Sequence, residues 1–104
     1  MESPVYLVWI RTQPCVVCDK LRQMGVVLTL NGRTALGIIE AAHVGDRGKG
    51  QKCSDLETLP MCDWHHRIGP EAHHVLGRRF WEHHGLDRSA LLDQHQRDFF
   101  AEAA

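Results

Sequence analysis

Hydrophobic residues at the start of the chain recur at helical spacing. Ser3 and Pro4 are typical of a helix start, as N-cap and first-turn proline, and apolar positions continue at this spacing as far as Ile10. Pro14 is expected to end the helix, because proline cannot continue one. The residues that follow, Cys15–Cys18, are therefore predicted to lie in a turn.

The middle of the chain has the pattern of strands. Residues 26–30 are rich in β-branched and apolar residues, and Asn31-Gly32 directly after them is a strong hairpin signal. Residues 33–44 are expected to form the return strand, followed by a glycine-rich basic loop over 45–52. Residues 58–60 are predicted to form another short strand, which their proline places at a sheet edge or strand end.

Helical patterns return in the last part of the chain. Residues 63–68 are expected to form a short helix and residues 71–84 a longer one, which Gly85 closes as a C-terminal cap. Asp87 is an N-cap for a final helix, over about 87–102, with one apolar face. Helices and short strands in this order predict an α+β fold.

Length and composition indicate one folded domain over residues 1–104. The chain is 43% hydrophobic and 24% charged, which is ordinary for a globular protein, but 104 residues is short enough to favour a metal or disulfide staple. No run approaches the ~20 apolar residues that a membrane helix needs, and the N-terminus lacks the basic start of a signal peptide. We therefore expect a cytoplasmic protein without a membrane partner.

The cysteines predict a structural zinc site. Cys15-x2-Cys18 is followed, after 43 residues, by Cys62-x2-His65, and two such knuckles can complete a tetrahedron around zinc. One alternative is that Cys15 and Cys18 form a redox pair while Cys62 is a small buried apolar residue. Cys53 is interpreted as a free thiol, although it could replace His65 as the fourth ligand.

Histidines are concentrated in one part of the chain. Of eight histidines, seven lie between His43 and His84, and His43 stands at the end of an apolar strand. His65 and His66 are adjacent on a predicted helix and therefore point ~100° apart. One of them can complete the zinc site while the other faces the strand that carries His43.

Two further histidine pairs follow in the predicted helix 71–84. His73-His74 can supply metal ligands or simply lie on a polar helix face, and the residues alone leave both readings open. For His83-His84 we favour the polar face.

The order of these motifs resembles the HNH endonucleases, and most of all the small phage and prophage HNH proteins that include a recombination-enhancing type. The motifs are Pro14-Cys15-x2-Cys18, Glu40-Ala41-Ala42-His43-Val44, Gly50-Gln51-Lys52-x2-Asp55 and Leu59-Pro60-Met61-Cys62-x2-His65-His66-Arg67. The match runs from about residue 6 to 85. It implies a zinc-stapled ββα-metal (His-Me finger) core, about 15–84, with flanking N-terminal and C-terminal helices.

The resemblance also implies roles for individual residues. His43 matches the general base, His66 matches the metal ligand on the helix, and Asp55 matches loosely a position between them that orients the loop. His74, in His74-x2-Gly77, resembles a further ligand. The implied reaction is metal-dependent hydrolysis of DNA phosphodiester bonds, with imidazole as base and one divalent cation.

One position departs from the family pattern. Many HNH proteins have a metal-binding Asp or His directly before the base, where this chain has Ala42. The missing ligand has to come from His73, His74, Asp46, Asp55 or water. Neutral imidazoles suit Zn²⁺, Ni²⁺ or Mn²⁺, whereas Mg²⁺ prefers more oxygen ligands. Ala42 also motivates an alternative function, a catalytically inactive zinc-dependent nucleic-acid-binding module.

Basic residues near the expected base are candidates for nucleic-acid binding. Arg47, Lys49 and Lys52 are on the glycine-rich loop, and Arg67 follows the helix histidines. They can contact phosphates of single- or double-stranded DNA without reading sequence, or belong to a solvated loop. The net charge of −1 gives no overall attraction to DNA. No recognition helix with a base-reading pattern stands out, so sequence preference is expected to be low or supplied by a recombination protein partner.

Overall fold

The structure is a computed structural model that describes residues 3–25, 29–30, 33–34, 38–45 and 54–103. Its elements in chain order are α1 (Pro4–Ile10), α2 (Val16–Gln23), β1 (Thr29–Leu30), β2 (Arg33–Thr34), β3 (Ile39–His43), η1 (Asp55–Glu57), β4 (Thr58–Cys62), η2 (Trp64–Ile68), α3 (His73–Leu76), α4 (Arg79–His84) and α5 (Arg88–Ala103). The predicted α+β class is confirmed.

Strands β3 and β4 form the central sheet of the described structure. They are antiparallel, with Ile39 opposite Cys62 at one end and His43 opposite Thr58 at the other. Every residue of β4 is buried, because helices cover this strand from more than one direction. The pairing therefore places the predicted base and a predicted zinc ligand at opposite ends of one short ribbon.

The prediction for residues 26–44 is partly wrong. The strands on either side of Asn31-Gly32 do pair, Leu30 with Arg33, as the hairpin signal predicts. The return strand is not continuous over 33–44, however: it divides into β2 and β3, and β3 pairs with β4. Burial explains the choice, since Thr58–Cys62 offers β3 an apolar partner that packs in the core.

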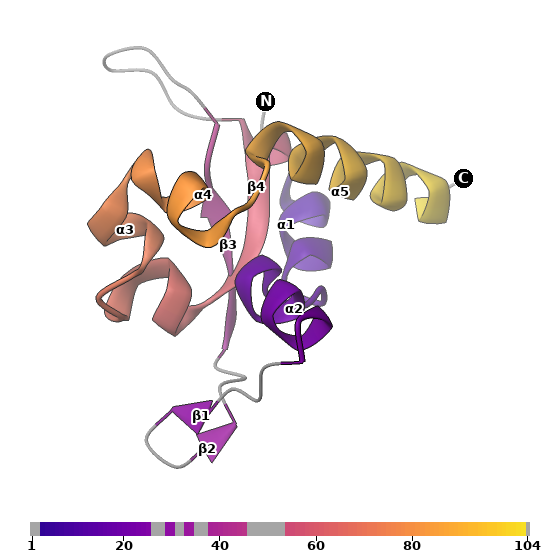
Figure 1. Ribbon diagram of the computed structural model, residues 1–104. Coiled ribbons are helices and arrows are strands. Elements are labelled where there is room, and N and C mark those ends of the chain that lie inside the picture. The colour runs from indigo at the N-terminus through magenta and orange to yellow at the C-terminus, as the bar shows by residue number, and fades with distance from the viewer. Residues whose placement is uncertain (1–2, 26–28, 31–32, 35–37, 46–53, 104) are drawn as a thin grey trace.

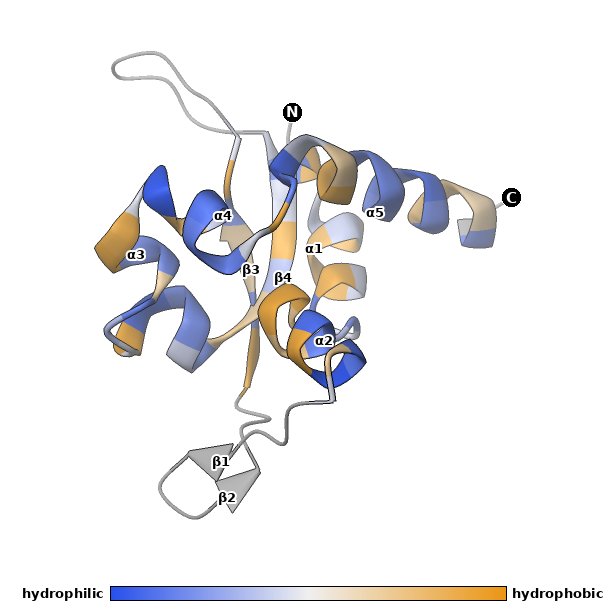
Figure 2. Ribbon diagram, in the orientation of Figure 1, coloured by the Kyte–Doolittle hydropathy of each residue, from blue (hydrophilic) through white to orange (hydrophobic). Residues whose placement is uncertain are grey.

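Figure 1 shows α1, α2 and α5 gathered on one side of β3 and β4, with α3 and α4 on the other. The core consists of buried side chains from these strands and from α2 and α4, with further apolar residues packed against them: Cys15, Val16, Val17, Cys18, Ala42, Val44, Leu59, Met61, Cys62 and Phe80. Figure 2 places apolar residues mainly on β3, β4 and α2, while α4 and α5 are mostly hydrophilic. None of the described helices is both long enough and apolar enough to cross a membrane.

Helix α2 replaces the predicted turn. The first helix ends at Ile10, before Pro14, and a second helix begins directly after Cys15. Val16 and Val17 have weak helix propensity, which is why the pattern did not indicate a helix. Both are buried in the core, so tertiary packing stabilises a helix that local preference does not.

The predicted helix 71–84 is also two elements. Helix α3 ends at Gly77, whose φ of 57° and ψ of −129° are accessible in practice only to glycine, and α4 begins at Arg79. Gly85 caps α4 in the left-handed conformation, as predicted. The break at Gly77 turns the chain between two histidine-bearing helices.

The final helix agrees with its prediction. The side chain of Asp87 accepts a hydrogen bond from the backbone N–H of Ala90 at 3.1 Å, which is the expected N-cap. Phe99 packs edge-on against Tyr6 with ring centroids 4.9 Å apart, so α5 is joined to α1 at the other end of the chain.

Candidate functional site

The four predicted zinc ligands come together in the structure. Cys15 caps α2, Cys18 lies in its first turn, Cys62 ends β4 and His65 lies in η2. Their ligand atoms all lie within 4.8 Å of one another, and all four residues are buried. Three segments that are distant in the sequence thus present three sulfurs and one imidazole nitrogen to a common point.

The distances within this Cys3His group agree with those around a tetrahedral zinc ion. Zinc–sulfur bonds of about 2.3 Å separate two sulfurs by about 3.8 Å. The Sγ atoms of Cys18 and Cys62 are 3.8 Å apart, and Nδ1 of His65 lies 3.2 Å from Cys62 Sγ and 3.4 Å from Cys18 Sγ. All three cysteines are free thiols, and His65 completes the set. The group can hold a metal such as zinc.

The members of the Cys3His group shift one another's protonation in opposite directions, and hydrogen bonds with Cys15 and Cys62 raise the pKa of the Cys18 thiol. Hydrogen bonds with Cys18 and Cys62 lower the pKa of the Cys15 thiol. Burial lowers the pKa of His65, but its hydrogen bonds with Cys15 and Cys62 outweigh this and raise the pKa to about 9. Thiolate character in a buried site needs a positive partner, which a metal ion supplies.

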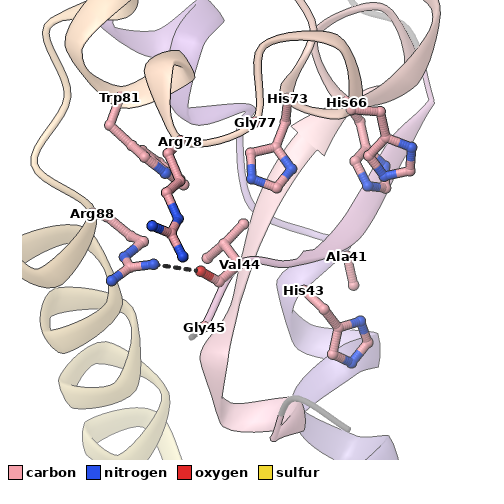
Figure 3. A pocket seen from close by; sticks show the side chains of 11 residues that line it. Ala41, His43, Val44, Gly45, His66, His73, Gly77, Arg78, Trp81 and Arg88 are labelled. Carbon is pink, nitrogen blue, oxygen red and sulfur yellow. Dashed lines mark hydrogen bonds between the residues drawn. The ribbon is translucent and has the colours of Figure 1, made fainter. Parts of the chain in front are cut away.

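A second cluster, the histidine pocket, is a cavity of about 460 Å³ on the side of the sheet that faces α3 and α4. Its lining residues are Ala41, His43, Val44, Gly45, His66, His73, His74, Gly77, Arg78, Trp81 and Arg88. None of these is acidic, and Figure 3 shows the imidazoles and the two guanidinium groups around one space. The pocket suits an anionic ligand, a metal ion or both.

His43 and Asp55, both predicted as catalytic residues, are in contact. Nε2 of His43 lies 2.9 Å from Oδ1 of Asp55. The hydrogen bond from His43, together with the backbone N–H of Ser3 at 2.8 Å, lowers the pKa of Asp55. An ionised carboxylate only accepts hydrogen bonds, so Nε2 carries the proton and Nδ1 of a neutral His43 keeps its lone pair. Ser3 lies at the N-cap position of α1 but makes no side-chain cap hydrogen bond. Its backbone N–H donates to Asp55.

His66 is held by Glu40 on β3. Its Nδ1 lies 2.8 Å from Oε1 of Glu40, and Arg67 donates two hydrogen bonds of 2.8 Å to the same carboxylate. Hydrogen bonding by Arg67 is the main reason that the pKa of Glu40 is lowered to about 2, against the opposing effect of burial. As predicted, the adjacent His65 and His66 serve different places, the Cys3His group and the histidine pocket.

His73 and His74 also reach the histidine pocket. The rings of His66 and His74 are 4.5 Å apart between centroids, and Nδ1 of His73 is buried without a hydrogen-bond partner. Burial, followed by the neighbouring charges of His74 and His66, lowers the pKa of His73 to about 4, and burial likewise lowers that of His74. Neutral imidazoles are the form that binds metal ions.

The four pocket histidines are arranged more openly than the Cys3His group. Across the part of the chain that the structure describes, only the Cys3His group brings three or more ligand atoms within 4.8 Å of one another. Two tetrahedral imidazole ligands would place their ring centroids roughly 5 Å apart, close to the His66–His74 separation of 4.5 Å. A pocket cation held by His66 and His74 would complete its shell with other ligands, such as water or substrate oxygens.

Ala42 lies on the opposite face of β3 from the pocket. Its side chain is fully buried in the core, whereas Ala41 and His43 on either side of it line the pocket. Alternate residues of a strand point to opposite faces, so a ligand at position 42 would point into the core. His73 and His74, by contrast, line the pocket.

The predicted nucleic-acid contacts are only partly described. Arg47, Lys49 and Lys52 lie outside the described residues, as do Asp46 and Cys53. Arg67 is described, and its guanidinium is engaged by Glu40 in two hydrogen bonds. A phosphate would have to compete with that carboxylate for Arg67.

Sequence reasoning missed two charged residues, Glu40 beside the pocket residue His66 and Arg88 in the pocket lining. Glu40 was part of a quoted motif but had no role, and Arg88 was not identified as a site residue, whereas Arg78 was expected as part of a phosphate-binding track. Arg88 donates a hydrogen bond of 3.1 Å to the Val44 carbonyl, and Figure 3 shows the Arg78 guanidinium directed toward the same region. No local signal marks Glu40 or Arg88, because one meets His66 only through the fold of β3 against η2 and the other reaches the pocket only from the start of α5.

His83 and His84 lie away from the pocket lining. His83 is 3.3 Å from a carboxylate oxygen of Glu71, and Nε2 of His84 is 2.9 Å from the Glu71 backbone carbonyl. Both contacts are compatible with the polar-face interpretation.

Comparison of the chain with protein-family models, with curated proteins and with solved structures found no match.

Proposed function

We propose that the protein is a metal-dependent endonuclease of the HNH type that hydrolyses DNA phosphodiester bonds in the histidine pocket. The observation that carries the proposal is the convergence of His43, paired with Asp55, and of His66 and His74 on one cavity whose described lining residues include no acidic side chain. The sequence of elements supports it, since β3, β4 and η2 follow one another as two antiparallel strands and a helical turn. The Cys3His group at the far end of β3 and β4 would then be the structural staple.

His43 is the proposed general base. Asp55 holds Nε2, so Nδ1 is the atom that can take a proton from water. The water oxygen adds to phosphorus, its proton passes to Nδ1, and the bond from phosphorus to the 3′ oxygen breaks. Of the pocket residues, Arg78 supplies a fixed positive charge that can hold the phosphate before attack.

His66 and His74 are the proposed ligands of a divalent cation, with His73 as a third candidate. When bound, the cation would polarise the phosphate and stabilise the charge that develops on the departing oxygen. Neutral imidazoles suit Mn²⁺, Ni²⁺ or Zn²⁺, and Mg²⁺ would need more oxygen ligands from water and substrate.

The test is cleavage of supercoiled and single-stranded DNA by protein that keeps its Cys3His metal, after Mg²⁺, Mn²⁺, Ni²⁺ or Zn²⁺ is added separately. We expect His43→Ala to reduce the rate about 10²- to 10⁴-fold, the usual contribution of a general base. Asp55→Asn should reduce it less, because His43 remains. His83→Ala is the matched control, since His83 pairs with Glu71 outside the pocket.

A second function remains open because the pocket histidines are less closely spaced than the Cys3His ligands. This is the inactive zinc-dependent nucleic-acid-binding module. It predicts DNA binding that survives His43→Ala and no cleavage with any metal. Cleavage by wild type that His43→Ala leaves unchanged would instead show that the proposed base is wrong.

A further inference from the structure

Glu40 connects β3 to η2 through one carboxylate and two side chains. Oε1 of Glu40 is 2.8 Å from Nδ1 of His66 and 2.8 Å from Nε of Arg67. Oε2 of Glu40 is 2.8 Å from Nη2 of Arg67. The His66 side chain is only 13% exposed and that of Glu40 27% exposed, so these contacts are partly shielded from water. The arrangement is a chain of three residues that ends at the histidine pocket.

The two hydrogen bonds from Arg67 determine what Glu40 can do. A guanidinium that binds both oxygens of a carboxylate fixes its orientation and keeps it ionised. An ionised carboxylate has no proton to give, so the short contact with His66 requires Nδ1 to be the donor. The lone pair of neutral His66 is then on Nε2, on the opposite side of the ring from Glu40.

We propose that Glu40 is a positioning residue that holds His66 in the Nδ1–H tautomer, so that Nε2 can bind the divalent cation of the histidine pocket, and that Arg67 orients Glu40. The inference rests on the proposed function, because it assigns the pocket a cation. It also assigns Arg67 to binding Glu40, whereas the sequence predicted that Arg67 contacts a phosphate of DNA. Carboxylates that hold the second nitrogen of a metal-binding histidine are a common way to fix ring orientation and raise basicity.

The competing explanation is a purely structural bridge between β3 and η2. Such a bridge would affect stability when it is broken, but it would set neither the tautomer of His66 nor the affinity of the pocket for a cation. Glu40→Gln separates the two explanations, because glutamine keeps the size of the side chain and loses the charge. A neutral amide can both donate and accept, so it no longer requires the proton on Nδ1.

The first measurement is a long-range ¹H–¹⁵N NMR spectrum of the histidine side chains, recorded on protein with zinc in the Cys3His group and no other metal. We expect the ¹⁵N shifts of His66 in wild type to be those of the Nδ1–H tautomer, and Glu40→Gln to shift them toward a mixture or toward Nε2–H. Finding the Nε2–H tautomer in wild type would overturn the proposal without touching the assignment of His43 as base.

The second measurement is a titration of the same zinc-loaded protein with Mn²⁺, in which the electron paramagnetic resonance signal reports the unbound ion. Glu40→Gln should weaken Mn²⁺ binding about 10- to 100-fold, the usual effect of losing such a carboxylate. Arg67→Lys should also weaken Mn²⁺ binding, because lysine cannot bind both carboxylate oxygens in the same plane. Its effect should be smaller than that of Glu40→Gln, because the Glu40 carboxylate itself remains. Glu71→Gln is the matched control, a carboxylate that pairs with His83 outside the pocket.

Zinc content and thermal unfolding of each variant establish that it is folded. Unchanged Mn²⁺ affinity in folded Glu40→Gln, with or without a lower melting temperature, would reduce Glu40 to a structural bridge and leave the proposed nuclease intact. Failure of wild type to bind Mn²⁺ in the pocket would overturn the positioning role together with the proposed metal ligands. DNA cleavage by His43→Ala and wild type is scored separately, so these two failures are distinguishable.

Discussion

Short hydrogen bonds orient two of the histidines that line the histidine pocket. Asp55 orients His43, and Glu40 binds His66, so each of these two histidines has one nitrogen occupied by a carboxylate. The other nitrogen of each is then available for a proton or a metal ion. Arg78 adds a fixed positive charge on the same cavity.

Arg78 and Arg79 provide a direct test of phosphate binding at the residue scale. They are adjacent and equally charged, but only Arg78 is among the residues that line the pocket. Arg78→Ala should weaken binding of a short DNA about tenfold and reduce the dependence of log K on log salt by about one ion, while Arg79→Ala changes both less. Fluorescence anisotropy without added divalent metal avoids cleavage. Equal effects of the two variants would mean that the pocket does not hold the phosphate.

At the scale of elements, the Cys3His group joins three short pieces whose apolar residues also pack in the core. It connects the start of α2, the end of β4 and η2. Helix α2 has eight residues and η2 five, too few for a helix to be stable by itself in water. A metal ion that binds all three segments would stabilise the folded form, because the unfolded chain has no preformed site for the ion.

Zinc removal should therefore unfold the protein to a large extent. We expect Cys62→Ser to lose the bound zinc and to lower the melting temperature by at least about 10 °C, since each kcal/mol is worth about 4–8 °C in a domain of this size. Cys53→Ser is the comparison, because Cys53 is the one cysteine without a place in the predicted zinc site. Metal analysis and circular dichroism check both variants. A Cys62→Ser protein that keeps one zinc ion per chain would contradict the assignment of ligands.

At the scale of the whole molecule, the two ends of the described chain meet. Phe99 of α5 packs against Tyr6 and Trp9 of α1, with ring centroids 4.9 and 5.5 Å apart. Gln96 of α5 donates a hydrogen bond of 2.7 Å to the Leu56 carbonyl in η1, beside Asp55. Helix α5 thus packs against the elements that hold His43 in place, although it contributes only Arg88 to the pocket.

Neighbouring phenylalanines test this contact between α1 and α5. Phe99→Ala should lower the free energy of unfolding by about 1–3 kcal/mol, because it removes ring packing at a half-buried position. Phe100 is 55% exposed, so Phe100→Ala should cost less than about 1 kcal/mol. Urea denaturation of the zinc-loaded proteins measures both. Comparable losses would indicate that α5 is held by other contacts than the Tyr6–Phe99 pair.

Local chemistry was sufficient to predict several features from the sequence. Pro4 at a helix start, Gly85 at a helix end and Asp87 as N-cap all act through backbone groups within a few residues, so no tertiary partner is needed. The Cys-x2-Cys and Cys-x2-His spacings likewise identified the four members of the Cys3His group, because knuckle geometry is local to each pair. The separation of His65 from His66 followed from the helical rotation between adjacent residues.

Tertiary packing decided the features that the sequence patterns missed. Helix α2 exists because Val16 and Val17 are buried, and β3 pairs with β4 because that partner lies in the core. Glu40 meets His66 from β3, and Arg88 reaches the pocket from the start of α5. The sequence by itself therefore determined the local caps and the zinc knuckles, whose energies depend on near neighbours. Only the folded chain brought together charges from distant segments, because their contacts depend on how those segments pack.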